Sequence, residues 1–162
     1  TQGSVAVDGA PTYPGLPSEV LRYDIDTGDS SVFIEQPIPL PDSLGFVSML
    51  GIAWGPDCDA SDCEPFTTDF AGGLRRHDDQ GALLWEVSTS YMEGAATGAL
   101  SFGANGEVFV PGFLDEMSPG YVMRFAAEDG AALPGMDQTF ALLADPDPEL
   151  VRPIGALFVA GM

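Results

Sequence analysis

Oxygen-bearing side chains that could hold a cation crowd the segment DCDASDCE at residues 57–64. Calcium takes about six to eight oxygen ligands, and alternating polar residues can point several oxygens at one centre. The segment differs from an EF-hand loop, because Asp62 stands at the turn-glycine position and Thr68 at the position of the final glutamate. Two interpretations stay open: a calcium site, or a braced loop of solvated carboxylates. The candidate metal ligands are Asp57, Asp59, Ser61, Asp62 and Glu64.

The two cysteines of the chain, Cys58 and Cys63, lie inside this segment. Two thiols without neighbouring histidines are too few for a structural zinc site, and the single histidine, His77, is 14 residues beyond Cys63. We therefore predict a disulfide that closes a short loop, which implies an oxidising compartment. Paired cysteines, one histidine and no lysine together favour a secreted protein, extracellular or periplasmic.

Acidic residues dominate the charge of the chain. The sequence has 25 Asp and Glu against five Arg and no Lys, for a formal net charge of −20 over 162 residues. Such a charge disfavours nucleic acid and anionic membranes as partners, and it attracts cations or basic proteins. The alternative is a hydrated surface for a salty medium. Without lysine, Schiff-base and P-loop chemistry are excluded, and no stretch of about 18 apolar residues predicts a membrane-spanning helix.

An internal repeat indicates which elements position these residues. The pattern (Leu/Met)-Arg-x-x-x-(Asp/Glu)-x-Gly occurs as LRYDIDTG at 21–28, LRRHDDQG at 74–81 and MRFAAEDG at 123–130. A β-prone run follows each copy. An apolar strand, an acidic turn that ends in glycine and a second strand predict a β-hairpin at each copy, with the glycine supplying a positive φ.

A second pattern alternates with the first. LGIAWGPD at 50–57, GALSFGAN at 98–105 and GALFVAGM at 155–162 share small residues followed by a bulky pair. Units of about four short strands with a period near 50 residues and no helical periodicity predict an all-β fold, a β-propeller. A β-sandwich is the alternative. The single segment 1–162 is divided into a first unit (4–38), a second unit (50–88), a third unit (98–144) and the inner strand of a further or shared unit (154–160).

The segments VLRYDIDTG, GIAWGPD, TTDFAGGLRRHDDQG and ALSFGANGEVFV resemble blades of the NHL-repeat, streptogramin-lyase and gluconolactonase-like β-propellers. Most members of this group have six blades, and the resemblance implies about three blades in this chain. It further implies a ring that closes with a second copy of the chain or with additional blades of a longer polypeptide.

The longer loops are expected on one face of such a propeller, and long loops often carry function. We take this long-loop face as the candidate binding site; the alternative is a solvated acidic surface. Its candidate residues are Tyr13, Asp42, Asp69, Phe70, Tyr91, Glu93, Asp115, Glu116, Asp145 and Asp147.

The resemblance does not carry a catalytic set onto this chain. Gluconolactonase-like propellers hold a divalent cation with carboxylates and typically two asparagines, whereas the one asparagine here, Asn105, falls in an expected hairpin turn. The streptogramin-lyase pattern relies on a histidine, whereas His77 lies inside a repeat turn. We therefore expect a binding or scaffolding protein with no assigned catalytic residue. The alternative is a metal-dependent lactonase or lyase that acts at the long-loop face.

Overall fold

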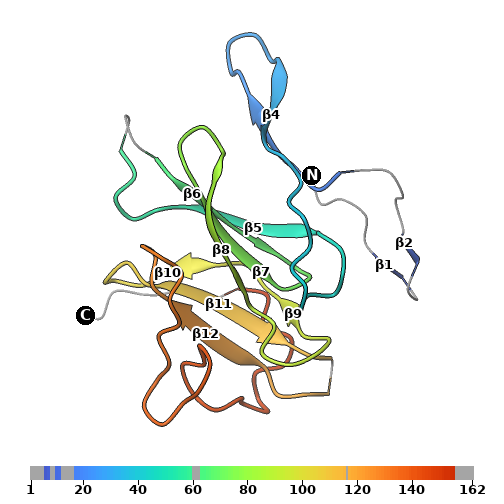
Figure 1. Ribbon diagram of the computed structural model, residues 1–162, viewed down its shortest axis with the longest axis vertical. Coiled ribbons are helices and arrows are strands. Elements are labelled where there is room, and N and C mark those ends of the chain that lie inside the picture. Colours follow the sequence, from blue (N-terminus) through green and yellow to red (C-terminus); the bar gives the residue numbers. More distant parts are fainter. Residues whose placement is uncertain (1–5, 8–9, 12–16, 60–62, 116, 156–162) are drawn as a thin grey trace.

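The computed structural model describes residues 6–7, 10–11, 17–59, 63–115 and 117–155. Within these residues the fold is all-β, as predicted, and every strand pairing is antiparallel (Figure 1). No helix in the described part of the chain is long or apolar enough to cross a membrane. The strands are β1 (Ala6–Val7), β2 (Ala10–Pro11), β3 (Val20–Tyr23), β4 (Ser30–Ile34), β5 (Met49–Trp54), β6 (Pro65–Asp69), β7 (Gly73–His77), β8 (Leu83–Ser88), β9 (Ala96–Thr97), β10 (Ser101–Phe102), β11 (Val108–Phe113) and β12 (Tyr121–Phe125).

The second unit is a four-stranded meander in the order β5-β6-β7-β8. Side chains alternate across a strand, so the register gives this sheet two different faces. The apolar face carries Phe66, Leu74, Arg76, Trp85 and Val87, which pair across β6, β7 and β8. The polar face carries Thr67, Asp69, Arg75, His77 and Glu86.

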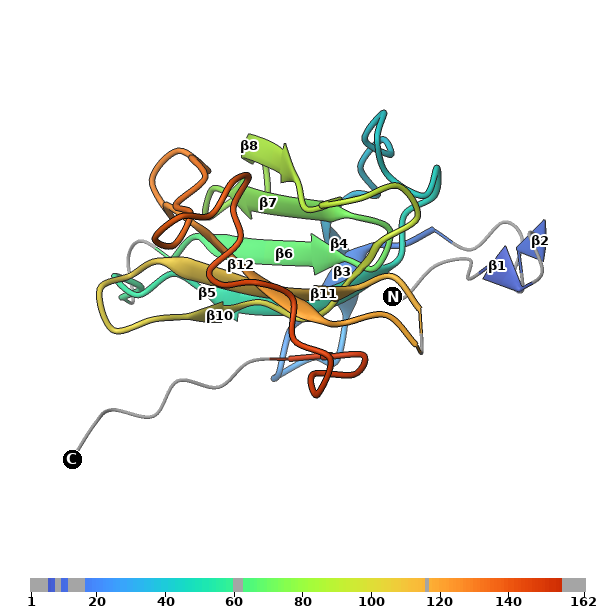
Figure 2. The same ribbon diagram turned by 90° about the horizontal axis from the view of Figure 1, so that it is seen from below.

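The third unit packs against the apolar face of the second (Figures 1 and 2). In it β11 pairs with β12 along one edge and with β10 and β9 along the other. The core between the two sheets includes Phe66, Leu74, Val108, Met123 and Phe125, each at most 2% exposed. Edge-to-face contact between Phe66 and Phe102, with ring centroids 5.0 Å apart, joins β6 to β10.

The three sequence repeats form three glycine turns. Gly28, Gly81 and Gly130 have φ angles of 77°, 87° and 74°, the left-handed region that favours glycine. In the first turn the Asp24 N–H donates to the Asp29 carbonyl, and in the third the Ala126 N–H donates to the Ala131 carbonyl. The first two repeats are β-hairpins, β3–β4 and β7–β8, as predicted.

The second turn is one residue shorter than the other two. There the Asp78 N–H donates to the Ala82 carbonyl. Asp24, Asp78 and Ala126 donate the hydrogen bonds that close the three turns. The residues two positions before these donors are Arg22, Arg76 and Arg124. The structural counterpart of the other repeat arginines is therefore Arg76, whereas the sequence pattern aligned Arg75 with them.

Each repeat turn of the second and third units lies on the outer strand of the unit before it. A Cβ at Gly81 would collide with the carbonyl oxygen of Phe33 on β4, and one at Gly130 would lie 2.9 Å from Val87 and 3.0 Å from Trp85 on β8. The ring centroids of Phe33 and Trp54 are 6.5 Å apart, and Trp54 lies on the polar face of the second unit. In the described chain the first unit therefore packs on the second, and the second packs on the third, through the same kind of contact between a repeat turn and an outer strand.

Two expected strands differ from the structure or lie partly outside the described residues. Residues 138–144, the expected outer strand of the third unit, form no regular strand and make one bridge, Met123 to Leu142. The positive φ angles of Asp137 and Phe140, 62° and 56°, break the extended conformation there. In the first unit β1 pairs with β2, and β3 pairs with β4 alone among the described residues. Of the expected inner strand 154–160, residues 156–160 lie outside the described residues.

Candidate functional site

A groove of about 430 Å³ separates the first unit from the second. Two of its apolar or aromatic side chains are exposed, Tyr23 at 62% and Ile52 at 49%. Such exposure is typical of a surface that a partner covers. The groove is lined by Glu19, Val20, Leu21, Tyr23, Met49, Leu50, Gly51 and Ile52.

The groove runs along two strand edges. Consecutive residues of β5 line it, together with neighbouring residues of β3, although their side chains alternate between faces. This lining indicates strand edges as its walls. Within the described residues β3 pairs only with β4, and β5 is the first strand of its sheet and pairs only with β6. The β3–β4 hairpin projects at one end of the molecule (Figure 1).

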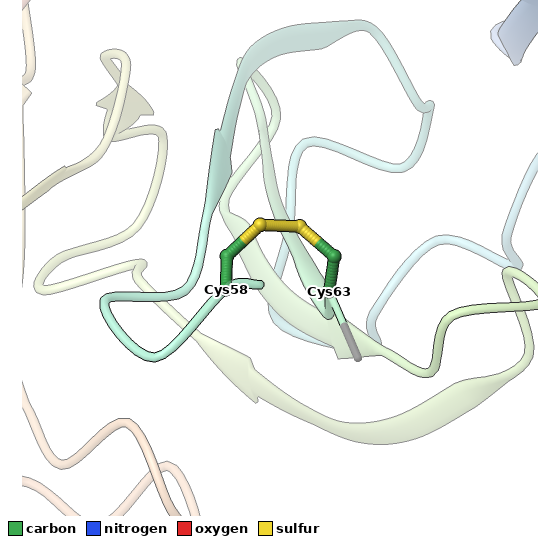
Figure 3. The surroundings of a disulfide bond; sticks show 2 residues. All are labelled: Cys58 and Cys63. Carbon is green, nitrogen blue, oxygen red and sulfur yellow. A yellow bond between two sulfur atoms is a disulfide. The ribbon is translucent and has the colours of Figure 1, made fainter. Parts of the chain in front are cut away.

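A second hollow, of about 590 Å³, lies at the hairpin end between the second and third units. The predicted disulfide is present, and it closes the loop between β5 and β6 at one wall of this hollow, with Cα atoms 4.3 Å apart (Figure 3). The hollow is lined by Gly55, Pro56, Asp57, Cys58, Glu64, Phe66, Arg76, Asn105, Gly106, Glu107, Ala126, Ala127, Glu128 and Leu133.

Arg76 joins the two units at this hollow. Its guanidinium forms a salt bridge with Glu64 and donates to the carbonyls of Ala127 and Glu128 at 3.0 and 2.8 Å. The Trp85 indole N–H donates to the same Glu128 carbonyl at 3.1 Å. Glu64, the residue that follows Cys63, is therefore linked to the third unit through Arg76.

The candidate cation ligands are not gathered in the described part of the chain. Asp57 and Asp59 are exposed, Glu64 is paired with Arg76, and Ser61 and Asp62 lie outside the described residues. The described residues contain no group of three or more His, Cys, Asp or Glu side chains placed to hold a metal ion.

Replacing both cysteines by serine should lower the free energy of unfolding by about 2 kcal/mol, because the unfolded chain then loses the closure of a short loop. Urea denaturation of the double variant beside the oxidised wild type measures the difference. Reduced wild type is the control, and it should match the variant. A variant as stable as the oxidised protein would contradict the prediction.

A buried ionic cluster occupies the polar face of the second unit. The Arg75 side chain is 1% exposed and forms a salt bridge with Asp69, which is 2% exposed. Its Nε donates to a Glu86 carboxylate oxygen at 3.1 Å, while Asp69 also accepts the Ala71 N–H at 2.9 Å. Burial raises the pKa of Asp69, and the hydrogen bond and charge of Arg75 oppose that rise. Asp69, a candidate of the long-loop face, therefore has its carboxylate engaged inside the fold.

His77 lies at the end of the same polar face. It is 2% exposed, and its Nε2 is 3.2 Å from the Thr67 hydroxyl oxygen. Burial lowers the pKa of His77 below its ordinary value of 6.5, because a low-dielectric site disfavours the imidazolium.

This depressed pKa predicts a loss of stability in mild acid. Below pH 6.5 the unfolded chain takes up a proton at His77 before the folded chain does, so the unfolding free energy falls with pH. The contribution is fully present above pH 6.5 and falls by at most about 1.4 kcal/mol per pH unit below it. His77→Gln removes the titration. Denaturation between pH 8 and 5 should show the wild type losing more stability than the variant, whereas parallel curves would refute the assignment.

The other nine long-loop candidates fall into four groups. The aromatic ones make ring contacts: Phe70 with Phe113 at 6.1 Å, and Tyr91 with Tyr121 at 5.2 Å. The exposed acidic ones mainly serve local turns or face solvent. None of the eight candidates that the structure describes lines either hollow. Asp115, Asp145 and Asp147 bond within their loops, Asp42 and Glu93 are exposed, and Tyr13 and Glu116 lie outside the described residues.

Asp115 shows what such a local carboxylate does. It accepts the N–H groups of Met117 and Ser118, each at 2.7 Å, and these hydrogen bonds lower its pKa. The groove residues, by contrast, were missed by the sequence reasoning. No local sequence pattern marks these residues, because the groove forms between strand edges of two different units.

Comparison of the chain with protein-family models, curated proteins and solved structures finds no match in any of the three.

Proposed function

We propose that the chain is a three-unit segment of an NHL-like β-propeller that acts outside the cytoplasm as a binding or scaffolding module. Its ring is completed by a second copy or by further units. The observation that carries this proposal is the repeated stacking contact, in which Gly81 lies on β4 and Gly130 lies on β8.

The faces of the units support the same arrangement. Arg76 and its pairing partner Phe66 belong to the face of the second unit that meets the third, and their counterparts in the third unit are Arg124 and Phe109. The opposite face of the third unit, with Val110 and Met123, is the one packed on the second. Units that stack in one sense, front on back, generate a ring, whereas a two-sheet sandwich has no such progression.

Charge and covalent structure fit a binding role in an oxidising compartment. The disulfide is typical of extracellular and periplasmic proteins. A formal charge of −20 steers cationic partners toward the surface and keeps a scaffold hydrated. We therefore take a basic protein or peptide as the class of ligand for the module.

A tandem polypeptide tests the ring directly. Two copies joined by a flexible Gly/Ser linker of ~20 residues raise the effective concentration of one half for the other. We expect a monodisperse particle with a radius of gyration of about 20 Å, the value of a compact chain of that length. Electron micrographs should show a ring with a central channel. An elongated particle whose radius of gyration is half as large again would overturn the propeller proposal.

A further inference from the structure

The outer strand of the third unit is interrupted by an insertion. The Leu133 N–H donates to the Arg124 carbonyl, and Leu142 bridges to Met123, the residue before Arg124 in β12. Leu133 and Leu142 therefore lie opposite consecutive residues of β12, although residues 134–141 separate them in sequence. In the second unit the residues at the corresponding places of β8 are adjacent in sequence. We call residues 134–141 the excursion.

The excursion begins beside the counterpart of the arginine that joins the second unit to the third. Arg76 donates through Nη1 to two successive carbonyls in the repeat turn of the next unit. Its counterpart Arg124 donates instead within its own unit, through Nε to the Leu133 carbonyl at 2.9 Å and through Nη2 to the Pro134 carbonyl at 3.4 Å. The base of the excursion thus gives Arg124 the kind of partner that a following unit gives to Arg76, a pair of successive backbone carbonyls.

The acidic partners of the two arginines differ accordingly. Glu64 and Glu107 each stand two residues before the strand residue that pairs with the arginine. Glu64 binds Nε and Nη2 of Arg76, whereas the Glu107 carboxylate is 4.0 Å from Nη1 of Arg124. The Leu133 carbonyl occupies the Nε of Arg124 and leaves the carboxylate at this distance. A stacked arrangement like that of Arg76 therefore requires the Arg124 guanidinium to leave the excursion.

At the other end of the molecule, the turn of the first unit has no preceding unit to lie on among the described residues. An added Cβ at Gly28 would meet no atom within 4 Å there. Ile25 holds the place that Ala127 holds in the third turn, one residue after the donor that closes the turn. Ile25 is 97% exposed, whereas Ala127 packs against the hydrophobic core. The first turn is thus an unstacked copy of a turn that stacks elsewhere in the chain.

The two ends of the described chain complement each other. One end carries a turn without a preceding unit, and the other carries Arg124, the counterpart of the arginine that binds such a turn. The second unit lies between the β3–β4 hairpin and the third unit (Figure 1). The turn of one molecule therefore does not reach Arg124 of the same molecule, and a second copy supplies it.

The acidic residues of the first turn do not prevent this contact. The Asp24 carboxylate is engaged inside the turn, where it accepts the Asp26 and Thr27 N–H groups at 2.9 and 2.8 Å. The third turn is also acidic, with Glu128 and Asp129, and it nevertheless stacks on the second unit. Two chains of formal charge −20 still repel one another as a whole, so their association should strengthen as salt screens that repulsion.

We propose that the excursion is an intramolecular cap on Arg124, which the Gly28 turn of a second copy displaces when two copies associate. The carbonyls of Ile25 and Asp26 then bind Arg124 as the carbonyls of the third turn bind Arg76. The excursion and the turn compete for one guanidinium, so the excursion sets the concentration at which copies associate. This inference rests on the proposed propeller and names the contact through which a second copy joins it.

Sedimentation velocity tests the contact in the full chain. In low salt at low micromolar concentration the protein should be a monomer, and in 0.5 M NaCl it should form a dimer as its concentration rises. Ile25→Glu should raise the dimer dissociation constant at least tenfold, because it places a further carboxylate in the interface. Ile38→Glu is the matched control, since Ile38 is 84% exposed and lies outside the turn, and it should leave the constant unchanged.

Removal of the cap should have the opposite effect. Deleting residues 134–141 joins Leu133 to Leu142 in the register that both already have on β12, and it should lower the dissociation constant at least tenfold. Near-ultraviolet circular dichroism checks that the shortened chain folds. Should it not fold, Gly135→Ala decides in its place, because the added Cβ would collide with the Leu143 carbonyl oxygen and loosen the excursion. This variant should also associate more tightly than the wild type.

Three results overturn the inference. They are a full chain that stays monomeric in 0.5 M NaCl, a dimer that Ile25→Glu weakens no more than Ile38→Glu does, and a folded variant without the cap that associates no more tightly than the wild type. A compact tandem particle beside any of these results leaves the propeller intact, whereas an elongated tandem particle overturns the propeller itself.

Discussion

Replacing Arg75 with methionine should lower the free energy of unfolding by about 3–5 kcal/mol, as for a buried ion pair that loses one partner. Asp69 would stay buried at 2% exposure without its guanidinium, and Glu86 would lose its 3.1 Å hydrogen bond from the Arg75 Nε. Methionine keeps the length of the side chain, so the change removes charge and hydrogen bonds more than volume. Guanidinium denaturation at pH 7.5 measures the loss.

The pH dependence of that loss identifies Asp69 as its source. Burial already raises the pKa of Asp69, and without Arg75 it should rise further. A raised folded-state pKa gives stability that is present at low pH and is lost as the pH rises through that pKa. The difference between wild type and Arg75→Met should therefore be smaller at pH 4.5 than at pH 7.5.

Two further variants isolate the buried pair. Adding Asp69→Asn to Arg75→Met removes the uncompensated carboxylate and should restore part of the stability at pH 7.5. Arg22→Met is the exposed control, since Arg22 lies over the Phe33 ring at 5.4 Å and should contribute about 1 kcal/mol or less. Equal losses for Arg75→Met and Arg22→Met would show that the buried pair has no special weight.

The repeat pattern predicted the turns correctly but not which arginine is buried. The three glycines and the acidic residues before them specify hairpin turns by local chemistry alone, and these turns are present. The segment LRRH offers two adjacent arginines, whose side chains point to opposite faces of β7. The sequence pattern places each arginine by its distance from the turn glycine. Because the second turn is one residue shorter, this distance selected Arg75, whereas the structural counterpart of Arg22 and Arg124 is Arg76.

The two inter-unit interfaces follow from this shift. Arg75 and His77 of the second unit correspond to Met123 and Phe125 of the third, on the face that meets the preceding unit. The second and third units therefore meet through apolar side chains, whereas the polar face of the second carries an ion pair. This difference between the two faces depends on which side chains of neighbouring units meet, and the sequence of a single repeat does not specify that.

The candidate site was the least predictable part. Carboxylates are so frequent that the sequence does not separate Asp69, buried against Arg75, from Asp115, which closes its own turn. The disulfide, by contrast, was predictable, since two cysteines five residues apart leave one short loop to close. The groove depends on which strand edges remain unpaired, and that follows only from the assembled sheets.

Replacing Gly81 with alanine should lower the unfolding free energy by about 2–5 kcal/mol. Two effects add. A left-handed conformation costs an L-residue about 1–2 kcal/mol, and overpacking against a fixed neighbour costs about 1–3 kcal/mol. The neighbour is the Phe33 carbonyl oxygen on β4, a backbone atom that moves only if the strand moves.

The other two repeat glycines separate these effects. Gly28 has a φ of 77° and no atom within 4 Å of an added Cβ among the described residues, so Gly28→Ala should show the backbone strain alone, about 1–2 kcal/mol. Gly130→Ala should fall between, because its new neighbours are the side chains of Val87 and Trp85, which can shift. Thermal and urea denaturation of the three variants give the order Gly81, Gly130, Gly28. Since the three φ angles agree within 13°, the excess of Gly81→Ala over Gly28→Ala measures the contact between units and not the turn. If the two losses were equal, the turn would not press on β4, and the stacking on which the propeller proposal rests would have no energetic support.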